Sequence, residues 1–110
     1  MPLRLDDARE LNAKAAEATR LLTALANRHR LAILCALVEG ERSVGALVDG
    51  VGLTQSALSQ HLAKLRAIGI VATRRDAQTI YYRLASAAAT SVMRTLADIY
   101  CGGRPRKISH

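Results

Sequence analysis

The chain has 110 residues, which is enough for one domain with its own core. Its 16 Lys and Arg against 9 Asp and Glu give a net charge of +7, which favours a polyanionic partner such as nucleic acid. No apolar run long enough to span a membrane and no signal peptide is visible, so we expect a cytoplasmic protein without membrane contact. With three Tyr, no Trp and no Phe, a single-strand binder based on base stacking is disfavoured.

The N-terminal half predicts helices. Leu5–Leu25 has the pattern of one long helix or two abutting ones with an apolar side. Arg28–Glu39 is hydrophobic almost all round, so we expect it to be a central buried helix that stops at Gly40. Ser43 then caps a short helix, Val44–Asp49.

A turn, Gly50-Val51-Gly52, leads into a predicted recognition helix over residues 54–68, called the reading helix below. Thr54 is a good N-cap, and Gly69 can take the left-handed conformation that ends the helix. Three leucines repeat at four and three residues on one face, namely Leu58, Leu62 and Leu65. The opposite face holds small and polar residues, namely Ser56, Gln60, Ala63, Lys64 and Ala67. A short helix, a glycine turn and a polar-faced second helix predict a helix-turn-helix.

Residues 70–84 predict a β-hairpin, or wing, after this helix. Its strands would be Ile70–Thr73 and Thr79–Leu84, joined by the polar loop Arg74–Gln78. The two adjacent arginines of the loop would lie near the tip, where phosphates are contacted. Tyr81 and Tyr82 point to opposite faces by strand alternation, so one should pack inward while the other is half exposed.

The predicted contacts with DNA come from the reading helix and the wing. Small and amide side chains can approach base edges, and basic ones suit phosphates. The residues concerned are Thr54, Gln55, Ser56, Ser59, Gln60, His61, Lys64, Arg74, Arg75 and Gln78. For an isolated helix an ordinary solvated face would be the simpler interpretation, but the basic hairpin that follows favours DNA.

After the hairpin, Ser86 can cap a last helix, Ala87–Cys101, which Gly102-Gly103 ends before a flexible basic tail over residues 102–110. Apolar helices at both ends, in residues 1–25 and 87–101, suggest a two-fold dimer. Residues 1–110 are thus expected to form a single, mainly α winged helix-turn-helix domain with a small β-hairpin and extra N- and C-terminal dimerisation helices.

Three motifs give the chain a family resemblance. They are Ala-Asn-Arg-His-Arg-Leu at residues 26–31, Ser-x-Leu-Ser-x-His-Leu-x-x-Leu at 56–65 and Tyr-Tyr-Arg-Leu at 81–84. Over Leu22–Tyr100 the chain resembles the ArsR/SmtB family of bacterial repressors. The resemblance implies a homodimer with its first and last helices at the interface. Such a dimer binds double-stranded operator DNA with an inverted repeat and releases it when an inducer acts.

Most relatives in that family sense metals, but their ligands are not found here. The short helix lacks the cysteine pair of arsenic, cadmium or lead sensors, and the last helix holds Asp98 but no His for a zinc or nickel site. His61 matches a family position, where packing or a phosphate contact is a better interpretation than metal ligation. We therefore expect neither a metal nor another cofactor.

The chain has two cysteines, Cys35 and Cys101, and no Cys-x-x-Cys motif. From composition alone, Cys35 is a small core hydrophobe and Cys101 an incidental thiol. The predicted central helix carries Cys35 and the predicted last helix carries Cys101. This arrangement nevertheless resembles the reactive-sulfur-sensing branch of the family, the SqrR/BigR and HlyU type. That resemblance implies that both cysteines react with persulfide or polysulfide, form a di-, tri- or tetrasulfide bridge, and release the DNA.

Three other functions remain open at this point. An ArsR-type repressor could respond to a different inducer, such as a general oxidant, a metal, haem or an organic ligand. A thiol oxidoreductase would need an exposed low-pKa cysteine motif and a substrate cleft, which the sequence does not suggest, so we do not expect an enzyme. A protein-interaction module would not need the polar helix face and the basic hairpin.

Overall fold

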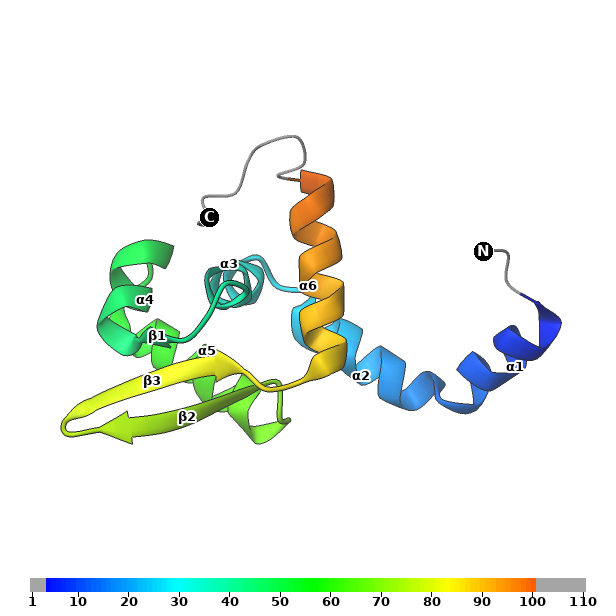
Figure 1. The fold of residues 1–110 in the computed structure, drawn as a ribbon, viewed down its shortest axis with the longest axis horizontal. Helices are drawn as coiled ribbons and strands as arrows, with labels where there is room; N and C mark the ends of the chain where they lie inside the picture. The colour runs from blue at the N-terminus through cyan, green and yellow to red at the C-terminus, as the bar shows by residue number, and fades with distance from the viewer. Residues whose placement is uncertain (1–3, 101–110) are drawn as a thin grey trace.

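The structure is a computed structural model that describes residues 4–100 (Figure 1). Its elements are α1 (Leu5–Ala13), α2 (Ala15–Leu25), α3 (Arg28–Leu37), β1 (Arg42–Ser43), α4 (Val44–Val51), α5 (Gln55–Ala67), β2 (Val71–Asp76), β3 (Thr79–Leu84) and α6 (Ala87–Tyr100). The predicted fold class, a mainly α winged helix-turn-helix, is confirmed. Cys101, Gly102-Gly103 and the predicted tail over residues 102–110 lie outside the described residues.

The N-terminal segment forms two abutting helices, as one of the two alternatives predicted. They meet at Lys14, whose backbone leaves the helical conformation at φ −110° and ψ 19°. α1 buries none of its residues and extends away from the other elements in Figure 1. α2 contributes Ala24 and Leu25 to the core from its C-terminal turn. The N-terminal segment thus reaches the core through its second helix and not through its first.

Helix α3 is buried on one side only. It begins at Asn27, whose Oδ1 accepts hydrogen bonds from the backbone N–H groups of His29 and Arg30 at 2.9 and 3.1 Å, and it ends two residues before the predicted Glu39. Ile33, Leu34 and Leu37 are its buried residues.

The prediction that this helix is buried all round is wrong, and so is the interpretation of Cys35 as a core residue. At 100° per residue, Ala32 and Cys35 lie opposite the buried face, and both are exposed. These two side chains are small and apolar, so the hydrophobic pattern of the sequence looks the same on every face of α3. In the structure only one face of the helix is buried.

The helix-turn-helix follows the predicted signals closely. Ser43 Oγ accepts a hydrogen bond from Ala46 N at 3.1 Å at the start of α4, and Thr54 Oγ1 accepts one from Ala57 N at 3.1 Å at the start of α5. α4 runs two residues beyond the predicted Asp49, to Val51, and the left-handed Gly52 ends it at φ +72°. The three leucines of the predicted stripe are buried, namely Leu58, Leu62 and Leu65.

The wing belongs to a three-stranded antiparallel sheet with the order β1-β3-β2. The sequence did not suggest β1, a two-residue strand in which Arg42 pairs with Tyr82 and Ser43 with Tyr81. Tyr82 packs against the core, while Tyr81 lies half exposed on the other face. The predicted alternation of the two tyrosines is therefore confirmed.

The predicted five-residue loop of the hairpin is wrong. β2 continues through Arg74 and Arg75 to Asp76, which pairs with Thr79. The turn has only two residues, and Ala77 takes a positive φ of +58° there. Two-residue hairpins favour such a conformation because the primed turn types match the twist of the strands better than types I and II do.

The core lies between α3, α5, the sheet and the first half of α6. Its fully buried large side chains are Ile33, Leu34, Leu37, Leu47, Leu58, Leu62, Leu65 and Val71. The described residues contain no buried polar or charged side chain. None of the helices in residues 4–100 is long and apolar enough to cross a membrane.

Candidate nucleic-acid interface

The face of α5 opposite the buried leucines is polar and open to solvent. Ser56, Ser59, Gln60 and Lys64 are exposed, as are the cap residue Thr54 and Gln55. These side chains lie on the side of α5 that faces solvent, because the buried leucines occupy the side that packs against the rest of the protomer. The geometry presents short hydroxyls, amides and one ammonium together, a set that suits base edges and phosphates.

His61 differs from its neighbours because its side chain points back into the protein. It is half buried, and its Nδ1 accepts a hydrogen bond from Arg30 Nε at 3.3 Å. Arg30 also donates to the carbonyl oxygen of Ala24 at 3.3 Å. Burial, with the nearby positive charges of Arg30, His29 and Lys64, lowers the pKa of His61 below its ordinary value. His61 thus ties α5 to α3 as a neutral acceptor.

A groove of about 500 Å³ connects the reading helix with the wing. Gln55 lines it from the start of α5 and Gln78 from the wing turn. Ser43 and Asp49 line it from the two ends of α4. Two predicted DNA contacts that are 23 positions apart in the sequence, Gln55 and Gln78, thus share one surface.

The two wing arginines lie on opposite faces of the sheet. Arg75 pairs with Ile80 and Arg74 with Tyr81 across the strands, and successive side chains of a strand alternate. Arg75 is exposed, and no ion pair joins it to any residue between 4 and 100. It is therefore available to a phosphate.

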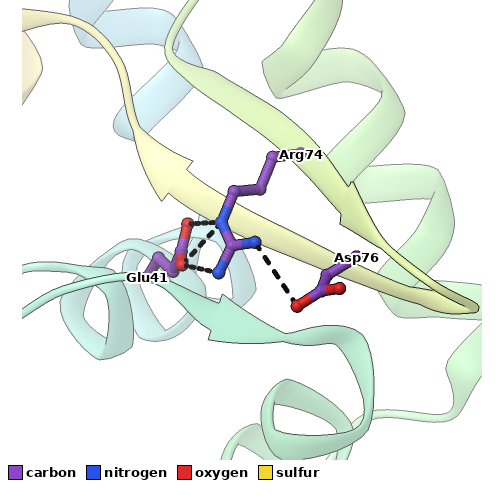
Figure 2. A network of polar contacts seen from close by, with 3 residues as sticks. All are labelled: Glu41, Arg74 and Asp76. Atoms are coloured by element: carbon purple, nitrogen blue, oxygen red, sulfur yellow. Dashed lines mark hydrogen bonds and ion pairs between the residues drawn. The ribbon is translucent and has the colours of Figure 1, made fainter.

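Arg74 is already engaged within the protein (Figure 2). Its Nε lies 2.9 and 3.0 Å from the two carboxylate oxygens of Glu41, and its Nη2 donates to Glu41 Oε1 at 2.7 Å. Its guanidinium carbon lies 4.5 Å from the ring centroid of Tyr81. The hydrogen bond from Arg74 is the main cause that lowers the pKa of Glu41, and the same bond raises the pKa of Arg74.

Glu41 was not predicted from the sequence as a functional residue. It precedes β1 and lies 33 positions from Arg74, so no local motif joins the two residues. Pairing of β1 with β3 brings Glu41 across the sheet to β2, and a two-residue strand leaves almost no periodic signal.

Of the two candidate sensing residues, the structure describes Cys35, which is exposed on α3. Cys101 follows the last residue of α6, Tyr100, and lies outside the described residues. Among residues 4–100 no three His, Cys, Asp or Glu side chains gather in a way that could hold a metal ion.

A capped helix with a polar exposed face, joined to a preceding helix by a glycine turn and followed by a basic hairpin, defines a winged helix-turn-helix DNA-binding protein. Residues 27–73 match the family of bacterial regulatory proteins described as the arsR family. The chain belongs to this family. It is a DNA-binding transcriptional regulator and not an enzyme.

Within the family the chain is similar to several characterised regulators. The nodulation protein NolR of Rhizobium meliloti is 58% identical over 83 residues, which cover 76% of this chain and 68% of NolR. The structure of reduced HlyU from Vibrio cholerae superimposes with a TM-score of 0.80 at 47% identity, covering 84% of this chain and 98% of HlyU. The structure of the transcriptional repressor BigR from Xylella fastidiosa gives a TM-score of 0.81 at 42% identity, covering 86% and 96%.

Proposed function

We propose that the protein is a dithiol-based transcriptional repressor. A homodimer binds an inverted-repeat operator while Cys35 and Cys101 are reduced, and it releases the operator when both react with persulfide or polysulfide. The observation that carries this proposal is the exposure of Cys35 on α3, the helix that also hydrogen-bonds to the reading helix through Arg30 and His61. A thiol in this position is accessible to a dissolved reagent. It also lies on a helix that is hydrogen-bonded to α5, the proposed DNA-recognition helix.

The chemistry needs two thiolates and one sulfur donor. The first thiolate attacks a sulfane sulfur of the polysulfide, whose S–S bond breaks, and the shorter polysulfide leaves with the electron pair. The first cysteine then carries a chain of one to three added sulfur atoms. The second thiolate attacks the sulfur next to the end of this chain and expels the terminal sulfur as hydrosulfide. The dithiol is thereby oxidised to a bridge of two to four sulfur atoms, and the donor is reduced.

On the DNA, the exposed face of α5 would enter the major groove with Ser56, Gln60 and Lys64, flanked by Thr54, Gln55 and Ser59. Arg75 and Gln78 of the wing are exposed and would contact the phosphate backbone of the DNA. Gln78 also lines the groove on the protein surface that Gln55 lines from α5. His61 supports this arrangement from inside, through its bond to Arg30. Arg74 was predicted on the backbone as well, but its pairing with Glu41 favours another role.

A homodimer is supported by the apolar side chains that the terminal helices leave uncovered. Leu5 and Leu11 of α1 are 70% and 61% exposed, and Ile99 and Tyr100 of α6 are 61% and 79% exposed. Since α1 buries nothing in the protomer, the packing of the protomer does not account for its two leucines. A partner copy would cover these residues and set the spacing of the two reading helices, which must meet major grooves about 34 Å apart.

The experiment is a fluorescence anisotropy titration of operator DNA with reduced protein, polysulfide-treated protein and the single variants Cys35→Ser and Cys101→Ser. Polysulfide should release the wild-type protein, while both variants stay bound. Intact mass after polysulfide, and separately after peroxide, should show a bridged protomer and its number of sulfur atoms. A Cys35→Ser protein that releases DNA normally after polysulfide contradicts the two-cysteine mechanism.

One observation favours a second candidate, a repressor induced by an organic ligand. A cavity of about 450 Å³ lies between α2, the end of α5 and the start of α6, with Leu21, Ile68 and Ile70 as apolar lining. Its charged lining residues are Lys14, Arg20 and Glu17, so the cations exceed the acids by one, and an amphiphilic anion would suit it. In that case the double variant Cys35→Ser/Cys101→Ser would still release DNA with its inducer, which the dithiol mechanism forbids.

A further inference from the structure

The ion pair between Glu41 and Arg74 changes what the wing can offer to DNA. Three features of the protein hold Arg74 at once: two carboxylate oxygens of Glu41 within 3.0 Å, the ring of Tyr81 at 4.5 Å, and Asp76 Oδ2 at 4.0 Å. Figure 2 shows the guanidinium lying between the two acids. A bidentate pair with a carboxylate occupies two of the five N–H donors of the guanidinium and neutralises its charge, which weakens its attraction for a phosphate.

The charges on the two faces of the wing differ because of this pair. Strand alternation and the register put Arg74, Asp76 and Arg83 on one face, and the positive charge of Arg83 also acts on Glu41. On that face two cations are balanced by two carboxylates. On the other face, Arg75 is exposed and has no acid within ion-pair distance among residues 4–100.

We propose that Glu41 limits the electrostatic affinity of the protein for DNA by holding Arg74 away from the phosphate backbone. If Arg74 left Glu41 for a DNA phosphate, the binding free energy would improve little. The phosphate charge would be neutralised, but the carboxylate of Glu41 would be left unpaired beside the DNA. Arg74 then adds nothing to counterion release, and Arg75 provides the phosphate contact of the wing. The inference rests on the proposed placement of the wing on the DNA backbone.

The central test is the substitution Glu41→Gln, which keeps the shape of the side chain and removes its charge. Freed Arg74 should then pair with a phosphate in each wing of the proposed dimer, steepening the slope of log K against log salt concentration by about 0.9 per wing, or about 1.8 in all. At about 0.15 M salt this corresponds to roughly fivefold tighter binding per wing, alike for the operator and an unrelated duplex, because a phosphate contact is not sequence-specific. The measurement is a salt titration of both duplexes by fluorescence anisotropy.

Glu39→Gln is the matched control. It removes the same charge two residues away, from an exposed side chain that makes no ion pair with another described residue. It should shift affinity less than Glu41→Gln and leave the slope unchanged. Equal effects of the two substitutions would overturn the proposal, since net charge alone would then explain the gain.

A double variant assigns the effect to Arg74. Arg74→Ala alone should leave the salt slope of the wild-type protein unchanged, and Glu41→Gln/Arg74→Ala should lose the gain of the single Glu41→Gln variant. If Arg74→Ala alone flattens the slope by about one unit per wing of the dimer, Arg74 contacts a phosphate despite Glu41 and the proposal is wrong. Weaker binding of Glu41→Gln would also overturn it.

Arg75→Ala separates this inference from the proposed function on which it rests. It should flatten the salt slope by about one unit per wing of the dimer on both duplexes. If it does and Glu41→Gln has no effect, only the role of Glu41 is wrong. If Arg75→Ala leaves the slope unchanged, the wing does not lie on the backbone, and both proposals for the wing fail together.

Discussion

At the scale of single residues, neighbouring side chains of the reading helix have different tasks. Gln60 points to solvent, whereas His61, the next residue, turns inward to Arg30. The 100° step of the helix separates them: the position of His61 adjoins the leucine stripe, and that of Gln60 does not. One residue can therefore recognise bases while its neighbour fixes the helix that carries it.

Substitution of Gln60 tests base recognition. An amide that makes a bidentate contact with a base discriminates by about 1–3 kcal/mol, so Gln60→Ala should reduce the preference for the operator over point-mutated operators by that amount. Its effect on an unrelated duplex should be small, because no phosphate contact is lost. Competition binding with a panel of operator variants measures the change. An equal loss on every duplex would show that Gln60 does not contact a base edge.

His61 gives folding a pH dependence. Its pKa is lowered by burial and by the charges of Arg30, His29 and Lys64, so the folded protein binds its proton less tightly than the unfolded chain does. The associated stability is complete above the unfolded pKa of about 6.5 and is lost as the pH falls from there through the folded pKa. Urea denaturation at about pH 7.5 and 5.5 should show a smaller pH effect for His61→Gln than for wild type. The lowered pKa of Glu41 places its own loss of stability at more acidic pH.

At the scale of elements, the boundaries follow from local hydrogen bonds. Asn27, Ser43, Thr54 and Ser86 each accept backbone hydrogen bonds at the first turn of a helix. Gly52 and Gly69, with φ of +72° and +79°, take the left-handed conformation at or just past a helix end. The wing turn is different, because an alanine occupies its left-handed position, a conformation that costs an L-residue about 1–2 kcal/mol.

Ala77→Gly should therefore stabilise the protein, by up to about 1 kcal/mol after the larger chain entropy of unfolded glycine is subtracted. The urea midpoint should rise without a change in the m-value. Ala72→Gly is the control, since Ala72 lies within β2 at an ordinary strand conformation, and the same exchange there should destabilise by about 0.5–1 kcal/mol. Loss of stability in both variants would contradict the turn described for Ala77.

At the scale of the whole molecule, the protomer is elongated, with principal extents of 50 × 33 × 23 Å. Figure 1 shows the cause, since α1 and the far end of α6 extend beyond the packed core. Their exposed leucine, isoleucine and tyrosine side chains would remain in water in an isolated protomer. Burial against a second copy would remove that cost.

Ile99→Glu should shift the protein toward monomers and weaken operator binding, because a carboxylate would be buried in the proposed dimer seam. Ile99 is 61% exposed in the protomer, so the fold should survive the exchange. Ala32→Glu is the control, since it adds the same charge at an exposed position of α3, outside the terminal helices. Light scattering after gel filtration measures the mass of each variant. Wild-type protein that is monomeric at the concentrations used for DNA binding would contradict the dimer.

The sequence by itself determined the features that depend on neighbours along the chain: the caps at Ser43 and Thr54, the leucine stripe of α5, and the hairpin that follows it. These follow from helical and strand periodicity and from side chains that bond to their own backbone within a few residues. The tertiary structure alone decided that Cys35 is exposed, that β1 pairs with β3, and that Glu41 holds Arg74. Each depends on segments far apart in sequence, whose packing leaves no local periodic signal.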